Sequence, residues 1–246
     1  KKDYALSLIN VNTLYKEIRM RSVICMNKDW KFIKKDVGLE MVATTKGETV
    51  DIPHTWNGLD GQDGGNDYHR GTCWYMKTFQ LPEGYEQGET WLEFKGVAMT
   101  AEVFLNGKKV GRHEGGYSTF RVNLSEGLKK ENVLVVSADN SKNNRIYPQK
   151  ADFTFYGGIY RDVHLIHVPK THFDLSMSGG PGIKVTPIVS GNTAEVTIET
   201  WISGEAKTVT YICDSQELIV PVIDGYARGT MTIENVRLWD GIKDPY

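Results

Sequence analysis

The sequence lacks any long apolar run. Among its 246 residues no stretch approaches the roughly 20 apolar residues that a transmembrane helix needs, so we expect no membrane span. Residues 1–26 also lack the apolar core and cleavage site of a signal peptide, and we interpret them as a lead-in segment. These absences leave the cellular compartment open.

Cysteine is scarce. Cys25, Cys73 and Cys213 are odd in number and show no CxxC spacing. Neither a disulfide framework nor a structural zinc site is therefore expected. Because free cysteine behaves as a small hydrophobic residue, we expect three buried free thiols.

The chain has no excess of one charge. Lys and Arg number 29 and Asp and Glu number 31, which gives a formal net charge of −2. Surfaces that bind nucleic acid neutralise phosphates with clustered Lys and Arg, and no such excess is available here. A nucleic-acid partner is therefore not expected.

Helical periodicity is nearly absent, with only a weak helical pattern at 4–18. A β/α barrel is excluded because it needs long amphipathic helices between its strands. Short β-branched and aromatic segments separated by glycine are present instead, which is typical of an all-β sandwich. The clearest hairpin is 102–110, where Asn106-Gly107 suits a type I′ turn. Further expected strands are 91–94, 133–138 and 163–168.

The composition changes at residues 178–182, which read Ser-Gly-Gly-Pro-Gly and precede a polar, threonine-rich region. We expect a second domain there, with strands at the spacing of an immunoglobulin-like sandwich. These strands are 183–189, 194–201, 208–213 and 229–234. The expected organisation is a lead-in segment at 1–26, a first domain at 27–170 and a second domain at 171–246.

Eight short blocks follow one another through the first domain. They are 27–32 (NKDWKF), 50–57 (VDIPHTWN), 70–79 (RGTCWYMKTF), 94–97 (FKGV), 103–111 (VFLNGKKVG), 115–120 (GGYSTF), 139–140 (DN) and 158–163 (GIYRDV). In this order the set resembles the N-terminal sugar-binding domain of glycoside hydrolase family 2, the family of β-galactosidases, β-glucuronidases and β-mannosidases.

The resemblance implies a jelly-roll first domain, an immunoglobulin-like second domain and a third domain, a β/α barrel that carries two catalytic glutamates. Retaining glycoside hydrolysis needs two carboxyl groups about 5–5.5 Å apart, and none of the family's barrel motifs occurs in this sequence. We therefore expect a non-catalytic fragment of a β-glycosidase, in the first place a β-galactosidase. Its second domain is expected to be incomplete at residue 246, and its intramolecular partner is the absent barrel.

Asp152 stands six residues before Gly158, the glycine that opens the block at 158–163. In the β-galactosidases of this family, an aspartate at this spacing contacts sugar hydroxyls and, in some members, a monovalent cation. The resemblance implies the same contacts for Asp152, and a carboxylate suits them because charge-assisted hydrogen bonds are strong. A solvated loop aspartate is the alternative interpretation.

The loop at 58–68 carries Asp60, Asp63, Asn66 and Asp67. It lacks the alternating oxygen ligands and the closing glutamate of a calcium-binding loop. The resemblance implies that Asn66 or Asp67 contacts the sugar, and the alternative is an ordinary exposed turn.

Aromatic residues and glycines surround the Asp152 position. Phe155 and Tyr156 are candidate substrate contacts at an edge that faces the barrel. We expect Gly157 and Gly158 where a positive φ or a close approach excludes a Cβ. Trp74 and Tyr75 are neighbours on one strand, so they must point to opposite faces.

The implied partners are a β-glycoside or oligosaccharide substrate and the barrel, and a homo-oligomer stays open. No cofactor is expected in this chain, although sodium or magnesium is implied for the full enzyme. A periplasmic or extracellular location is a family-level expectation. The alternatives are a β-glucuronidase or β-mannosidase of the same family, a free-standing carbohydrate-binding module or lectin, and a structural scaffold.

Overall fold

The structure is a computed structural model, and it describes residues 21–60, 68–85, 87–146, 156–213, 215–239 and 241–243. The chain divides into two compact units. The first contains the residues up to Tyr117 and Val122–Pro169, and the second contains Ser118–Arg121 and the residues from Lys170 onward. Nearly all regular structure is β-strand, so the expected all-β fold is confirmed. Within the described ranges, no helix has the length and hydrophobicity to cross a membrane. The weakly helical stretch at 4–18 lies outside these ranges.

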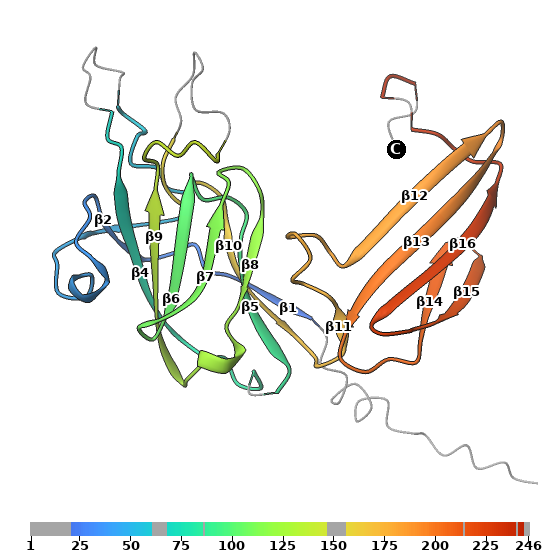
Figure 1. The fold of residues 1–246 in the computed structure, drawn as a ribbon, viewed down its shortest axis with the longest axis horizontal. Coiled ribbons are helices and arrows are strands. Elements are labelled where there is room, and N and C mark those ends of the chain that lie inside the picture. Colours follow the sequence, from blue (N-terminus) through green and yellow to red (C-terminus); the bar gives the residue numbers. More distant parts are fainter. Residues whose placement is uncertain are drawn as a thin grey trace, which may run out of the picture. The chain divides into compact units, whose positions relative to one another are not determined.

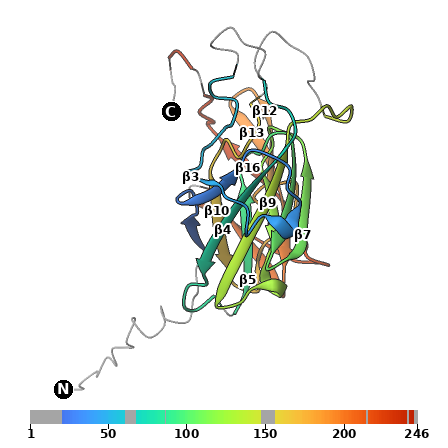
Figure 2. The ribbon, with the colours of Figure 1, turned by 90° about the vertical axis from the view of Figure 1, so that its left-hand side faces the viewer.

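The first unit contains two sheets (Figure 1). The four-stranded sheet has the order β1 (Ser22–Cys25), β10 (Val163–Val168), β5 (Glu89–Phe94) and β8 (Phe120–Asn123). The six-stranded sheet has the order β3 (Glu48–Val50), β2 (Trp30–Ile33), β4 (Thr72–Gln80), β9 (Glu131–Asp139), β6 (Thr100–Leu105) and β7 (Lys108–Glu114). Figure 2 shows this sheet face on, with β3 and β7 at its opposite edges. The 3₁₀ turns η1 (Leu39–Met41) and η2 (Ser125–Gly127) are the helical segments described in this unit.

The predicted hairpin is formed by β6 and β7. Asn106 and Gly107 connect the strands with φ values of 52° and 85°, as a type I′ turn requires. The Asn106 side chain also accepts a hydrogen bond from the Val133 N–H at 2.9 Å and donates to the Gly127 carbonyl at 2.9 Å. The turn is thereby fixed to the rest of the sheet.

The core of the first unit lies between its two sheets. Alternation along the strands turns one set of side chains inward, and the largest fully buried ones come from both sheets. They include Trp30, Phe32, Tyr75 and Leu134 from the six-stranded sheet and Leu92, Phe94 and Leu165 from the four-stranded one. Trp74 points to the opposite face from Tyr75, as predicted, and packs with Ile33, Val42, Phe104 and Val135.

Six strands are described in the second unit. They are β11 (His172–Phe173), β12 (Ile183–Ser190), β13 (Thr193–Ser203), β14 (Thr208–Cys213), β15 (Gln216–Pro221) and β16 (Tyr226–Glu234). The central strand β13 pairs with β11, β12 and β16, while β14 and β15 form a separate pair. All four expected strands of this region are present. The expected bounds of the two domains, 27–170 and 171–246, stay a prediction.

An apolar row on β12 is open to solvent. Val185 is paired with Ile198 on β13, which packs into the core of Tyr211, Val220, Ala227 and Met231. Val185 itself is 57% exposed, and Ile183 and Val189 on the same face are also exposed. An incomplete sandwich would leave such a row uncovered, and the incompleteness of this domain stays a prediction.

The cysteines differ from the expectation of three buried thiols. All three are free, but Cys25 is exposed and Cys213 is half-buried, whereas Cys73 is buried. The prediction is therefore wrong for Cys25. The physical reason is its place at the end of β1, an edge strand of the four-stranded sheet, where its side chain has a neighbouring strand on one side.

Candidate functional site

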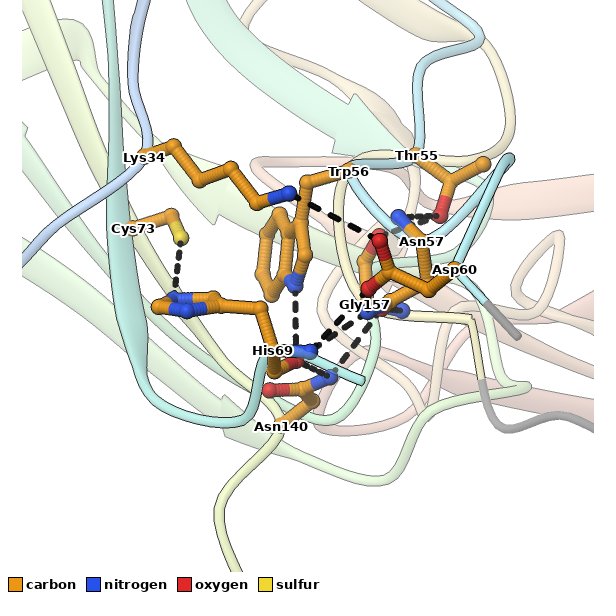
Figure 3. Close-up of polar contacts among 9 residues, drawn as sticks. All are labelled: Lys34, Thr55, Trp56, Asn57, Asp60, His69, Cys73, Asn140 and Gly157. Carbon is orange, nitrogen blue, oxygen red and sulfur yellow. Dashed lines mark hydrogen bonds and ion pairs between the residues drawn. The ribbon is translucent and has the colours of Figure 1, made fainter. Parts of the chain in front are cut away.

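The predicted sugar contacts fall mostly outside the described residues. Asp152, Asn66, Asp67 and Phe155 are not among them. Tyr156 is described, and its 45% exposure leaves it open to a ligand. Four described residues around the gaps at 61–67 and 147–155 nevertheless meet in one hydrogen-bonded network (Figure 3). They are Asp60 and His69 at the first gap, Gly157 after the second, and Asn140, which lies earlier in the chain than the second gap.

Asn57 lies at the centre of this network and is fully buried. Its Oδ1 accepts hydrogen bonds from the Gly157 N–H at 2.8 Å and from Asn140 Nδ2 at 3.2 Å. Its Nδ2 donates to Asp60 Oδ2 at 2.6 Å and to the His69 carbonyl at 3.0 Å. A side-chain amide has two donors and two acceptor positions, and protein groups occupy all four.

Asp60 and His69 stand on either side of the 61–67 gap. Asp60 Oδ2 accepts a hydrogen bond from the His69 N–H at 3.0 Å, and Lys34 Nζ lies 3.7 Å from Asp60 Oδ1. Burial acts to raise the pKa of Asp60, but the hydrogen bonds from Asn57 and His69, with the Lys34 charge, hold that pKa below its usual value. Asp60 is a buried anchor, so the exposed-turn interpretation of this loop is wrong at Asp60.

Three donors converge on the His69 carbonyl. Trp56 Nε1 donates to it at 3.2 Å, Asn140 Nδ2 at 3.2 Å and Asn57 Nδ2 at 3.0 Å. Asn140 directly follows β9, and its Oδ1 accepts the Gly71 N–H at 2.9 Å. Residues 69–71, which lead into β4, are therefore held at the His69 carbonyl and at the Gly71 N–H before the strand begins.

Gly157 and Gly158 follow the gap at 147–155 and are packed against residues 54–56. Thr55 Oγ1 donates to the Gly157 carbonyl at 2.7 Å. A Cβ at Gly157 would lie 2.2 Å from Trp56 Cζ2, and Gly158 adopts a φ of +123° with the His54 carbonyl 2.5 Å from its Cβ position. The expectation that glycine is required at both positions is confirmed.

His54 and Tyr75 form a second contact next to Gly158. His54 Nδ1 and Tyr75 Oη are 2.8 Å apart, and the His54 N–H donates to the Ile159 carbonyl at 2.8 Å. Burial lowers the pKa of His54 and raises the pKa of Tyr75 well above its usual value. The hydrogen bond therefore joins two side chains that are neutral at pH 7. Both residues lie directly against Gly158.

The network can position segments but does not offer the pair of groups that glycoside hydrolysis uses. Asp60 is the one carboxylate among the nine residues of Figure 3, whereas a retaining mechanism needs two. Asn57 and Asn140 lie in the blocks at 50–57 and 139–140, but no role was predicted for either. A signal for Asn140 was present in the sequence, because it is a polar residue two positions after the expected strand 133–138.

In this β-sandwich, one hydrogen-bonded network joins the residues that flank 61–67 to Gly157, which follows 147–155. Residues 44–169 match the family model described as glycosyl hydrolases family 2, sugar binding domain. The chain belongs to glycosyl hydrolase family 2.

Relatives with two different activities are similar to this chain. A β-glucuronidase from Bacteroides fragilis is 32% identical over 92% of this chain and 34% of its own length. A β-galactosidase from Thermoanaerobacter pseudethanolicus is 30% identical over 75% of this chain and 25% of its own length. The crystal structure of a Bacteroides uniformis β-glucuronidase superimposes with a TM-score of 0.79 at 29% identity, over 89% of this chain and 29% of that one. The chain thus spans a quarter to a third of the length of these relatives.

Proposed function

We propose that this chain is the non-catalytic N-terminal part of a retaining β-glycosidase and forms part of the sugar-binding wall of its active site. A β/α barrel outside the chain supplies the catalytic glutamates in this proposal. The observation that carries it is the convergence at Asn57: one network holds the ends of the segments that contain Asn66, Asp67 and Asp152.

Asp152 is the proposed hydroxyl contact in this wall. The segment that contains it runs between Asn140 and Gly157, both of which are bound to Asn57. Residues that are fixed around a contact before the ligand arrives lower the entropy cost of binding, and this supports a binding role at this end of the sandwich. Tyr156 is the proposed aromatic contact, since it is exposed and precedes Gly157, which Asn57 holds.

The glycoside that is cleaved has two candidates. The similar β-glucuronidases support a β-glucuronide substrate, which we place first. The spacing of Asp152 from Gly158 supports a β-galactoside, as does the similar β-galactosidase. A sodium or magnesium ion belongs to the proposal for the whole enzyme, with Asp152 as its contact in this chain.

The test uses a longer protein that continues past Tyr246 and includes a barrel. Hydrolysis of 4-nitrophenyl β-glucuronide and of the corresponding β-galactoside identifies the substrate. Asp152→Ala should lower kcat/KM on the preferred glycoside at least tenfold, since a charge-assisted hydrogen bond is lost. Asp174→Ala, in the second unit, is the matched control, and equal activity of Asp152→Ala and the unsubstituted protein would contradict the proposed contact.

The carbohydrate-binding-module alternative is tested on the 246-residue chain itself. Calorimetric titration with galactose and lactose should show no micromolar binding if the wall needs its barrel. Micromolar binding of a neutral sugar by this chain alone would favour a lectin.

A further inference from the structure

A polar pocket of about 470 Å³ lies beside the network, at the end of β9. Its lining includes Arg112 from β7, Asp139 from the end of β9, and Ser141, Lys142, Asn144 and Arg145 from the segment that follows. Asn140, the network residue, stands between two of these lining residues in the sequence. The pocket therefore adjoins the network at Asn140.

The segment at 141–146 is held in place by local contacts. The Ser141 N–H donates to Asp139 Oδ1 at 2.6 Å, and the Arg145 N–H donates to Asn143 Oδ1 at 3.0 Å. Ile146 is buried with Ala98 and Met99. The cationic side chains of the pocket thus project from a backbone that is fixed before a ligand arrives.

The pocket carries an excess of positive charge in a chain whose net charge is slightly negative. Arg112 and Arg145 both pair with one oxygen of Glu114, so two guanidinium groups share a single carboxylate. Lys142 adds a third cation. The Asp139 carboxylate is engaged by the Thr72 hydroxyl and the Ser141 N–H.

We propose that this pocket binds the carboxylate or sulfate of an acidic sugar residue that neighbours the cleaved sugar in an oligosaccharide. Guanidinium groups bind planar carboxylates and sulfate oxygens through paired N–H donors, and the side chains of Ser141 and Asn144 offer neutral donors beside them. The inference rests on the proposed function, because the pocket adjoins the network that would hold the sugar-binding wall.

The test titrates the 246-residue chain at low salt with three tetrasaccharides. Tetragalacturonate carries carboxylates, sulfated neocarratetraose carries sulfates, and cellotetraose is neutral. We expect binding of an acidic tetrasaccharide, weakening with added salt, and the acid that binds identifies carboxylate or sulfate as the ligand group. Cellotetraose should not bind.

Variants locate the binding. Arg145→Gln and Arg112→Gln should each lower the affinity for the acidic tetrasaccharide about tenfold. Lys108→Gln, on the hairpin at the opposite end of the sheet, should leave it unchanged. Equal binding of cellotetraose, no binding of either acid, or unchanged affinity in both arginine variants would overturn the proposal. The proposed function is judged separately, because the aryl glycosides used with Asp152→Ala contain no sugar beyond the cleaved one.

Discussion

Asn57 Oδ1 accepts a 2.8 Å hydrogen bond from the backbone N–H of Gly157, 100 residues further along the chain. The same side chain donates to Asp60 and to the His69 carbonyl. One buried amide therefore links the ends of both segments that carry the proposed sugar contacts. Under the proposed function, a substitution of Asn57 would affect substrate binding as well as stability.

Asn57→Ala should strongly destabilise the first unit. It leaves the Gly157 N–H, the Asp60 carboxylate and the buried Asn140 amide each short of a partner, and a single unsatisfied buried group costs about 1–3 kcal/mol. We expect a loss of about 3 kcal/mol in the free energy of unfolding, measured by urea denaturation. Asn144→Ala, at an exposed position, is the control and should change it by less than about 0.5 kcal/mol. Similar values for the two variants would contradict the central role of Asn57.

Gly157→Ala should be destabilising through a steric clash. The new Cβ would lie 2.2 Å from Trp56 Cζ2 and 2.7 Å from Asn140 Nδ2, so the indole or the amide must move. Overpacking of this kind costs about 1–3 kcal/mol, seen as a lower Tm. Gly58→Ala is the matched control, because its Cβ would meet its nearest neighbour, Thr55 Cγ2, at an ordinary 3.6 Å. A Tm for Gly157→Ala as high as that of Gly58→Ala would show that the Trp56 contact is not tight.

Asp60 should make the free energy of unfolding of the first unit decrease at acidic pH. Its pKa is lowered in the folded state, so its contribution is fully present above the ordinary aspartate pKa of about 3.9 and is lost as pH falls through the lower folded value. Asp60→Asn should flatten the decline in the free energy of unfolding below about pH 4. Asp224→Asn, in an exposed turn of the second unit, should leave this decline unchanged. A pH profile unchanged by Asp60→Asn would show that another group causes the decline.

Local patterns predicted much of the fold. The Asn106-Gly107 turn, the strands around it and the opposite orientations of Trp74 and Tyr75 follow from φ preferences and from alternation along a strand, which depend on adjacent residues. The same applies to Gly157 and Gly158, whose pairing marked a restricted backbone. A single sequence therefore predicts features that depend on residues close together in the chain.

The network itself could not be predicted in this way. Its bonds join Asn57 to Asn140 and Gly157, which are brought together by the pairing of β4 with β9 and by the return of the chain into β10. Asp60 looked like one more exposed acid of a glycine-rich loop, and only the folded chain surrounds it with donors. Burial of a polar group depends on distant strands and leaves no local pattern.

Thiol reactivity should separate the three cysteines. Burial raises the pKa of Cys73 to about 12, so its thiolate is scarce at pH 8, while Cys25 is exposed on an edge strand. We expect iodoacetamide to alkylate Cys25 first, half-buried Cys213 more slowly, and Cys73 only after urea unfolds the first unit. Peptide mass spectrometry over a time course measures each rate, and Cys25→Ser should remove the fast phase while leaving the other two. Rapid alkylation of Cys73 in the folded chain would show that the base of β4, next to His69 and the Asn57 network, opens readily.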